Sequence, residues 1–319
     1  MELYVFTNPQ QGATYNTIVT AAKAAEELGF DGFFTSDHYV AVGGVPGLPG
    51  PLDAWLTLAA LARETRRIQL GTLMTSATFR LPGPLSVAVA QVDQMSEGRV
   101  EFGFGTGWFE PDHTAYGIPF PDQGERFDRF EEQLAIITGL WATPVGERFS
   151  YEGQHYQLTD SPALPKPFQD PRPPIIIGGA GRTRTPRLAA QYAAEINNLY
   201  PAVPEVPAWQ ARVDAACEAI GRDPASLRRS AALLLVLGRD QAEIARRSDA
   251  GGVDNDVETV GADVAAMFER GLVGSPAQVV DRIGRLAEAG FTRLYLLTPR
   301  QFDVDHFEDF MRDVAPQLR

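Results

Sequence analysis

The chain has 319 residues, of which 44% are hydrophobic and 22% are charged, a balance typical of a folded globular enzyme and not of a disordered or fibrous protein. Its formal net charge of −13 argues against a nucleic-acid partner, because binding to phosphate backbones depends on clustered lysine and arginine. For this length we expect a single domain spanning residues 1–319, since α/β barrels with insertions reach this size.

The sequence predicts a cytoplasmic protein with no membrane partner. Its first residues, MELYVFTNPQ, lack a basic region followed by an apolar run, and no apolar stretch approaches the roughly 18 residues of a membrane span. The single cysteine, Cys217, has no partner for an intrachain disulfide, which suits a reducing compartment.

Short runs of β-branched or aromatic residues alternate with longer segments of helical period. This alternation predicts parallel strands joined by crossover helices. Eight strands are expected, at Leu3–Phe6, Gly32–Thr35, Ile68–Leu73, Val100–Phe104, Ile175–Ile177, Glu195–Asn197, Ala232–Val236 and Arg293–Leu297. The predicted fold is therefore of the α/β class, a TIM (β/α)8 barrel.

Helix signals stand beside the first and the last of these strands. Five apolar residues from Ile18 to Leu28 share one helical face, and Gly29 follows as a residue able to take positive φ. Before the last strand, Ser275 and Pro276 suit the start of a helix and Gly290 suits its end.

Two insertions interrupt the repeat, at about 108–174 and 249–261. The first contains a predicted helix from Gly124 to Trp141 and a predicted hairpin from Phe149 to Leu158 around Gly153. The second is acidic and rich in glycine, which predicts a mobile loop or lid. Insertions in barrels lie on the loops at the C-terminal ends of the strands, where active sites form, so both are functional candidates by location.

Four segments, taken in order, resemble one family. They are GFDGFFTSDHY, LGTLMTSATFR, GRVEFGFGTGWFEPDHTAYGIPF and GSPAQVVDRIGRLAEAGFTRLYL. Over nearly its whole length the chain resembles the bacterial luciferase-like superfamily, in particular its branch that depends on the deazaflavin coenzyme F420. The resemblance implies a homodimeric barrel whose mouth holds a flavin-type ring, with the phosphate tail bound by a glycine-rich loop.

Asp37 and His38 follow the second predicted strand. A histidine there can face the barrel mouth and titrate near neutral pH, although a loop histidine can also be plain surface. The position matches the histidine that exchanges a proton with the substrate in deazaflavin dehydrogenases of the family. The resemblance therefore implies a catalytic His38, with Asp37 orienting it or touching the ring. Because neighbouring strand residues point to opposite faces, a bend after Thr35 is required.

Two further segments are implied to hold the ring. Thr72, Leu73 and Met74 would support it with a cis peptide bond between Leu73 and Met74, and an ordinary buried strand end is the alternative. The glycines of GFGTG let backbone approach a ring, with Thr106, Gly107 and Trp108 lining the site. A Rossmann fingerprint is rejected here because its spacing requires a small residue where Trp108 stands; simple packing of Trp108 remains open.

The residue after this GTG also bears on the substrate. Sugar-phosphate dehydrogenases of the branch carry a glutamate there, whereas this chain has Trp108 and its first acid at Glu110, so that activity is not expected. Thr7 and Asn8, just past the first strand, are candidates for the substrate side of the ring, as is Glu110. Glu110, Asp112 and His113 lack the spacing of a metal site, and no metal is expected.

The fifth predicted strand leads into a glycine-rich loop and a helix that opens near Thr183. Free backbone N–H groups at such a start bind anions. The family binds the cofactor phosphate on this loop, and Arg182, Arg184 and Arg187 add positive charge; a solvated, arginine-rich helix start is the alternative. The candidate phosphate ligands are Gly178, Gly179, Ala180, Gly181, Arg182 and Thr183.

The prediction is an oxidoreductase that transfers a hydride between coenzyme F420 and a small organic substrate. An FMN-dependent monooxygenase, as in luciferases and alkanesulfonate oxygenases, is the alternative within enzymes, and a non-catalytic flavin or deazaflavin carrier is the alternative outside them. Asp37 and His38 favour the deazaflavin branch. His155 and His306 are assigned to structure or surface.

Overall fold

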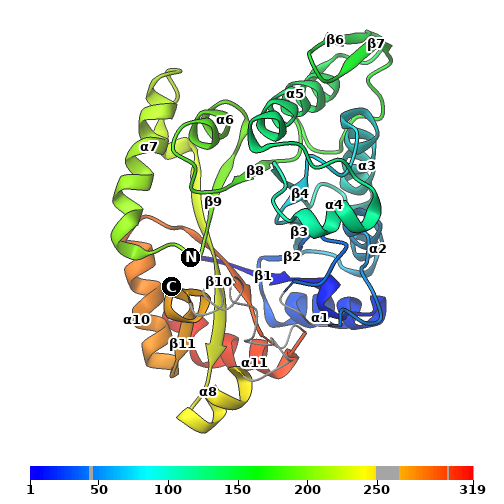
Figure 1. Cartoon of the computed structure of the whole chain (residues 1–319). Helices are drawn as coiled ribbons and strands as arrows, with labels where there is room; N and C mark the ends of the chain where they lie inside the picture. The colour runs from blue at the N-terminus through cyan, green and yellow to red at the C-terminus, as the bar shows by residue number, and fades with distance from the viewer. Residues whose placement is uncertain (43–45, 249–265, 300–301, 319) are drawn as a thin grey trace.

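Eight parallel strands close into a barrel in the computed structural model, which describes residues 1–42, 46–248, 266–299 and 302–318 (Figure 1). Each strand pairs with its neighbour in the ring, and β10 joins β9 to β12, which in turn pairs with β1. In ring order the strands are β1 (Glu2–Thr7), β2 (Gly32–Thr35), β3 (Gln69–Thr72), β5 (Val100–Gly105), β8 (Ile175–Gly178), β9 (Glu195–Leu199), β10 (Arg228–Leu237) and β12 (Arg293–Leu297). The predicted TIM barrel is confirmed.

All eight predicted strands are present, but β10 begins four residues earlier than its apolar run. The first residues of β10 are polar and lack the apolar pattern of a strand. Their side chains have partners at the barrel floor. Ser230 accepts a hydrogen bond from the Asn197 side chain at 2.8 Å, and Arg228 pairs with Glu2 at 3.3 Å. Two short strands add to the sheet, β4 (Thr75–Ser76) beside β5 and β11 (Leu272–Gly274) beside β10.

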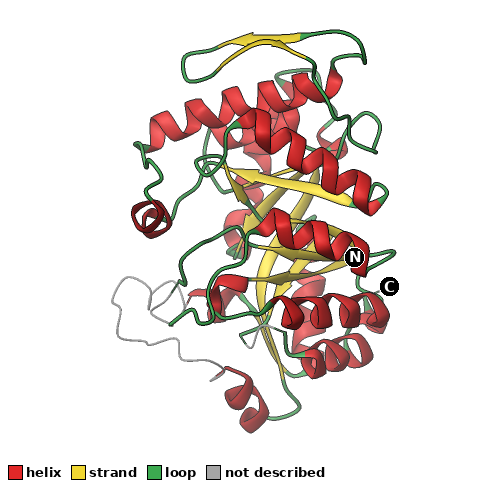
Figure 2. Cartoon of the chain, turned by 90° about the vertical axis from the view of Figure 1, so that its right-hand side faces the viewer, coloured by secondary structure: helices red, strands yellow, loops and turns green. Residues whose placement is uncertain are grey.

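Helices cover the outside of the barrel (Figures 1 and 2). The predicted signals hold at both ends of the chain: Gly29 ends the first helix with φ of 88°, and Ser275 begins a later one with a capping box to Gln278. No helix of the described ranges is long and apolar enough to cross a bilayer. The outer helices are α1 (Tyr15–Leu28), α2 (Ala54–Glu64), α3 (Pro82–Ser96), α5 (Gln123–Ala142), α6 (Arg184–Tyr192), α7 (Val206–Glu218), α8 (Gln241–Ser248), α10 (Pro276–Glu288) and α11 (Val304–Asp313), with single 3-10 turns at Pro9–Gln11, Val203–Glu205, Pro224–Ser226 and Ala315–Gln317.

The first predicted insertion contains α4 (Glu110–Tyr116), the long helix α5 and an antiparallel hairpin of β6 (Phe149–Glu152) and β7 (Gln157–Ser161). The expected helix and hairpin are therefore confirmed, with ends that agree to within three residues. The hairpin packs against α5 in a small apolar cluster of its own, at one extreme of the molecule (Figure 2). The second predicted insertion, 249–261, lies outside the described residues.

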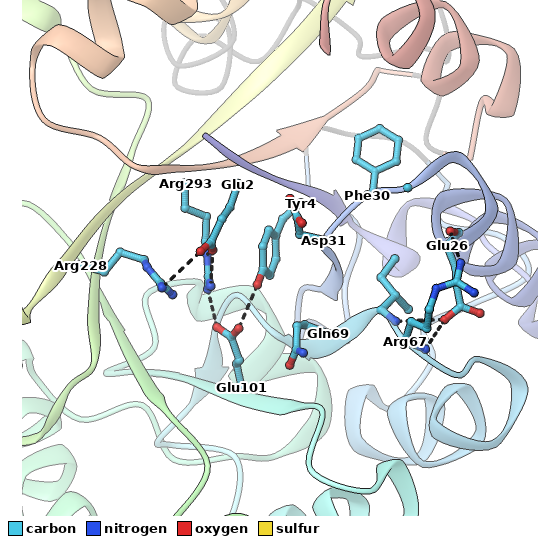
Figure 3. A pocket seen from close by; sticks show the side chains of 12 residues that line it. Glu2, Tyr4, Glu26, Phe30, Asp31, Arg67, Gln69, Glu101, Arg228 and Arg293 are labelled. Carbon is cyan, nitrogen blue, oxygen red and sulfur yellow. Dashed lines mark hydrogen bonds and ion pairs between the residues drawn. The ribbon is translucent and has the colours of Figure 1, made fainter. Parts of the chain in front are cut away.

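The floor of the barrel, at the N-terminal ends of the strands, is held by buried charge. Arg293 pairs there with Glu101, with Glu195 at 2.7 Å and with Glu2 at 2.6 Å. A cavity of about 590 Å³ opens beside this cluster, and Figure 3 shows its polar lining. Because active sites of such barrels lie at the opposite end of the strands, we assign the floor to stability.

Candidate active site

The His38 ring is held by a carboxylate from the first insertion. After β2 the chain leaves regular structure at Ser36, and His38 Nδ1 lies 2.6 Å from Asp112 Oδ2 on α4. The other Asp112 oxygen accepts the backbone N–H groups of Tyr39 and Val40, at 2.9 and 2.7 Å. Since a carboxylate only accepts, Nδ1 carries the hydrogen and Nε2 is left as the basic atom of the neutral ring. Asp112 thus fixes both the tautomer of His38 and the loop that carries it.

Of the two roles predicted for Asp37, orienting His38 is wrong, because its carboxylate is engaged elsewhere, and contact with the ring stays a prediction. Both carboxylate oxygens accept from Arg80, which also pairs with Asp53 at 2.6 Å. The Asp37 side chain is only 1% exposed, and burial raises the pKa of its carboxyl although Arg80 opposes this. The bend predicted after Thr35 is present, because regular strand structure ends at that residue. Asp37 therefore anchors the loop through Arg80, while Asp112 orients the histidine.

Two aromatic rings flank the imidazole. The Trp108 and Phe109 ring centroids lie 5.9 and 5.8 Å from that of His38, each nearly perpendicular to it. Trp108 is 65% exposed, so packing in the core is wrong, and packing at the surface stays the alternative to a role in the site. A large apolar surface consequently lies open beside the candidate catalytic ring.

His113, the neighbour of Asp112 on α4, is buried and contacts a different loop. Its Nδ1 donates to the Phe109 carbonyl at 2.9 Å, so Nε2 must accept from the Thr78 hydroxyl, 2.6 Å away. Burial lowers the pKa of His113 and favours this neutral state. Adjacent residues of α4 therefore attach it to two loops, one after β2 and one after β4.

These roles of Asp112 and His113 were not predicted. The sequence indicated only a polar cluster of both residues with Glu110, which is exposed, and a substrate contact for Glu110 alone. Among the described residues no cluster of metal-ligating side chains is found. The start of a helix at Glu110–Pro111 was the signal that could have indicated these roles. Adjacent residues of a helix point in different directions, so Asp112 and His113 can reach separate loops.

Glycines surround Met74 where β3, β5 and β8 end. The predicted cis peptide bond between Leu73 and Met74 is present. A Cβ at Gly178 would lie 2.7 Å from the Met74 Cε, and one at Gly103 only 1.8 Å from the Thr72 carbonyl oxygen. Gly107 has φ of 77°, a conformation that side chains disfavour. Glycine is therefore required for the close approach of these strand ends.

The residues predicted to contact the ring differ in their exposure to solvent. Thr72 is fully buried and its hydroxyl donates to the Gly103 carbonyl at 2.7 Å, so its side chain serves the barrel wall. Leu73 is nearly buried, whereas Met74, Thr106 and Gly107 are partly exposed.

The candidate phosphate loop borders a pocket of about 300 Å³. The pocket lies between the starts of α5 and α6 and is lined by Gln123, Gly124, Phe127 and the segment 181–185. Thr183 precedes α6 without capping it through its side chain, and Ala180, Gly181 and Arg182 are exposed. The uncapped start of α6 favours an anionic group there, whereas the start of α5 is capped by Asp122 and has Glu125 in its first turn.

The arginines of this region are not equally available. Arg184 pairs with Asp128 at 2.6 Å, and Arg187 pairs with Glu131 at 2.6 Å, so α5 neutralises both. Arg182 has no ion pair within the described ranges. The positive charge expected from three arginines is thus reduced to that of Arg182.

The two residues proposed for the substrate side, Thr7 as the last residue of β1 and Asn8 directly after it, lie at the C-terminal end of that strand. Thr7 is buried and its hydroxyl donates to the Phe34 carbonyl at 3.1 Å, so its side chain is part of the barrel wall. Asn8 is partly exposed and precedes a 3-10 turn. Of the other histidines, His306 is buried and its Nε2 accepts the Leu237 N–H at 2.9 Å, a structural role, while His155 lies in the hairpin insertion.

Comparison with known proteins finds relatives over nearly the whole chain. The sequence model of a family described as luciferase-like monooxygenase matches residues 1–293. The F420-dependent glucose-6-phosphate dehydrogenase of Beutenbergia cavernae is 30% identical over 92% of this chain and 91% of its own length. The F420-dependent hydroxymycolic acid dehydrogenase of Mycobacterium tuberculosis is 31% identical over 95% of this chain and 84% of its own.

Solved structures share the fold at lower identity. An F420-dependent secondary alcohol dehydrogenase in complex with an F420-acetone adduct superposes with a TM-score of 0.84 at 18% identity, covering 100% of this chain and 99% of that one. The monooxygenase RslO1 of Streptomyces bottropensis superposes with a TM-score of 0.83 at 22% identity, covering 100% of both chains. At these identities the likeness establishes the barrel fold alone.

Proposed function

The chain belongs to the luciferase-like monooxygenase family, and from that premise we propose that it is an F420-dependent oxidoreductase. It transfers a hydride between the deazaflavin coenzyme and a small organic substrate. The observation that carries this proposal is the His38–Asp112 pair at the C-terminal end of the barrel, with Nε2 of His38 left basic. The relatives that align over nine-tenths of the chain are named as F420-dependent dehydrogenases.

The residues present fit such a coenzyme. The glycines around Met74 let the ends of β3, β5 and β8 approach one another closely and leave the Met74 side chain partly exposed, as a surface for a ring. The 300 Å³ pocket beside Gly181, Arg182 and Thr183 suits the phosphate tail, because the uncapped start of α6 and the unpaired Arg182 favour an anion. When bound, the deazaflavin supplies a ring carbon, C5, that accepts or donates a hydride.

His38 manages the proton that accompanies this transfer. With its Nδ1–H committed to Asp112, the ring accepts a proton from a substrate hydroxyl at Nε2, or returns one to a carbonyl oxygen in the reverse direction. The buried Asp112 carboxylate stabilises the imidazolium that forms. A positioned acid–base group of this kind contributes about 10²- to 10⁴-fold in rate.

The FMN-dependent monooxygenase is the competing proposal, since monooxygenases share this fold. Such an enzyme consumes oxygen in each turnover, whereas hydride transfer to or from a deazaflavin does not. Oxygen uptake during turnover therefore separates the two. A non-catalytic carrier would bind the cofactor without turnover.

The test is cofactor-dependent turnover in the purified chain and in His38→Ala. We expect a change in the F420 absorbance with an accepted substrate, and a loss of about 10²-fold or more in kcat in the variant. F420 binding to the variant, followed by fluorescence, checks that the site is intact. Unchanged turnover in His38→Ala would show that the histidine is not catalytic.

A further inference from the structure

We infer that Arg80 is a positioning residue for His38, because one guanidinium binds the side chains on both sides of the histidine. The inference rests on the proposed function, since it adds a residue to the proton-transfer machinery of the same site. Arg80 stands in the turn after β4, just before α3. Its guanidinium bonds to the neighbours of His38, so it acts on the histidine through them.

Both flanks of His38 are held by the same guanidinium. On one side, the Asp37 carboxylate accepts from both terminal nitrogens of Arg80. On the other side, the Tyr39 hydroxyl accepts from Arg80 Nη2 at 3.3 Å. The His38 ring between them contacts Asp112 instead, at 2.6 Å. Three consecutive side chains are therefore fixed, two by Arg80 and one by Asp112.

Arg80 is itself held at the start of α2. Its Nη2 lies 2.6 Å from Asp53 Oδ2, and the other Asp53 oxygen accepts the Trp55 and Leu56 N–H groups. The Arg80 side chain is only 17% exposed, so salt screens these contacts less than it would at the surface. The loop that carries His38 is thus tied to the first turn of a helix.

The turn that carries Arg80 closes a triangle of contacts around His38. The Thr78 hydroxyl of this turn donates to His113 Nε2 on α4, and the same helix supplies Asp112 to His38. Arg80 adds the third side, from the turn back to the loop after β2. Each of the three segments contacts the other two, so removing Arg80 opens the triangle.

The shape of the guanidinium, and not its charge alone, makes this arrangement possible. Its planar fork directs two nitrogens at the Asp37 carboxylate, while Nη2 also reaches Tyr39 and Asp53. Lysine carries the same charge on a single nitrogen and cannot reproduce the fork. Arg80→Lys therefore keeps a cation beside the buried Asp37 but loses the contacts that fix both flanks of His38.

The first test observes His38 directly, without coenzyme or substrate. Proton and nitrogen-15 NMR of the purified chain reports the Nδ1–H that lies against Asp112, and His38→Gln identifies its signal among the four histidines. We expect Arg80→Lys to raise the rate at which this proton exchanges with solvent about tenfold, because the loop opens more often. An unchanged exchange rate overturns the inference.

Two controls separate positioning from a general loss of structure. Arg129→Lys changes an arginine that pairs with Glu125 at 2.7 Å on α5, and is expected to leave the His38 exchange rate unchanged. In Arg80→Lys, the nitrogen-15 signals of His306, a buried histidine of α11, should stay as in the wild type. Equal disturbance of His38 and His306 would mean that Arg80 supports the whole fold, and overturns the inference.

Tyr39→Phe keeps the inference testable if Arg80→Lys does not fold. It removes one hydroxyl and keeps the aromatic ring, whose centroid lies 4.9 Å from that of Phe79. We expect a smaller rise in the exchange rate of the His38 proton, about threefold, because one flank stays bound. An unchanged rate in a folded Tyr39→Phe overturns the inference.

A double-mutant cycle links the geometry to turnover. If Arg80 acts through His38, Arg80→Lys lowers kcat about tenfold with a smaller change in KM, and lowers it little further in Asp112→Asn. Losses that multiply independently overturn the inference. Failure of F420 turnover in the wild type would contradict the proposed function, and the NMR measurement would still decide whether Arg80 positions His38.

Discussion

His38 and Asp112 are 74 residues apart in the sequence, and their side chains meet at 2.6 Å. The contact joins the loop after β2 to helix α4 of the first insertion. The insertion therefore does more than extend the barrel: it supplies the carboxylate that fixes the tautomer of the candidate catalytic histidine.

Asp112→Asn tests this relationship. The amide keeps the shape but no longer stabilises an imidazolium, so we expect kcat to fall about 10²- to 10⁴-fold with little change in the Kd for F420. Nitrogen-15 NMR of the imidazole should show Nδ1 protonated in the wild type and a mixture of tautomers in the variant. Glu152→Gln, an exposed carboxylate on the hairpin, is the control. A purely structural Asp112 would alter stability without changing the tautomer.

Gly178→Ala tests the glycine cradle. The added methyl group would meet the mobile end of Met74 at 2.7 Å, so we expect a folded protein whose Kd for F420 is raised about tenfold. Gly103→Ala should instead destabilise the fold, because its methyl group would meet backbone at 1.8 Å. Gly83→Ala has open space around it and serves as the control. An unchanged Kd in Gly178→Ala would place the ring elsewhere.

Arg182→Ala tests the phosphate pocket. Loss of the unpaired cation should raise the Kd for F420 about tenfold and make that Kd less sensitive to salt. Arg187→Ala removes a charge that Glu131 already neutralises and that does not line the pocket, so a smaller effect is expected. Titrations at two salt concentrations measure both quantities. Equal effects of the two variants would indicate only a general loss of positive charge.

The barrel floor predicts a pH-dependent stability. Burial raises the pKa of Glu195 to about 7 in the folded protein, with Arg293 opposing. A carboxyl whose pKa is raised by folding stabilises the fold when protonated, and this contribution is lost as pH rises through 7. Glutamine imitates the protonated form, so the Tm of Glu195→Gln should improve relative to wild type between pH 5 and pH 8, values chosen on either side of about 7. A Tm difference that is constant with pH would contradict the shift.

Local sequence patterns were sufficient for the strands and for the capped helices. Gly29 and the pair Ser275–Pro276 act within one turn of their own helices, so their consequences can be predicted without tertiary structure. The start of β10 could not be predicted, since the partner of Arg228 is Glu2, far away in the sequence.

The site was predictable in outline but not in its pairings. His38 was identified from its place after a strand together with the resemblance to deazaflavin dehydrogenases, yet the adjacent Asp37 was taken as its partner because Asp112 comes close only through the fold. For the same reason Arg184 and Arg187 looked available, although their counterions lie more than fifty residues earlier on α5. Long-range pairing of charges leaves no local pattern in a single sequence.

The most direct test of the account is a parallel titration of the purified chain with F420, FMN and FAD, followed by turnover with an accepted substrate in an oxygen electrode. We predict that F420 binds most tightly and that its absorbance changes during turnover without oxygen uptake. A protein that copurifies with FMN, binds it more tightly than F420 and consumes oxygen with the substrate would contradict the proposed function.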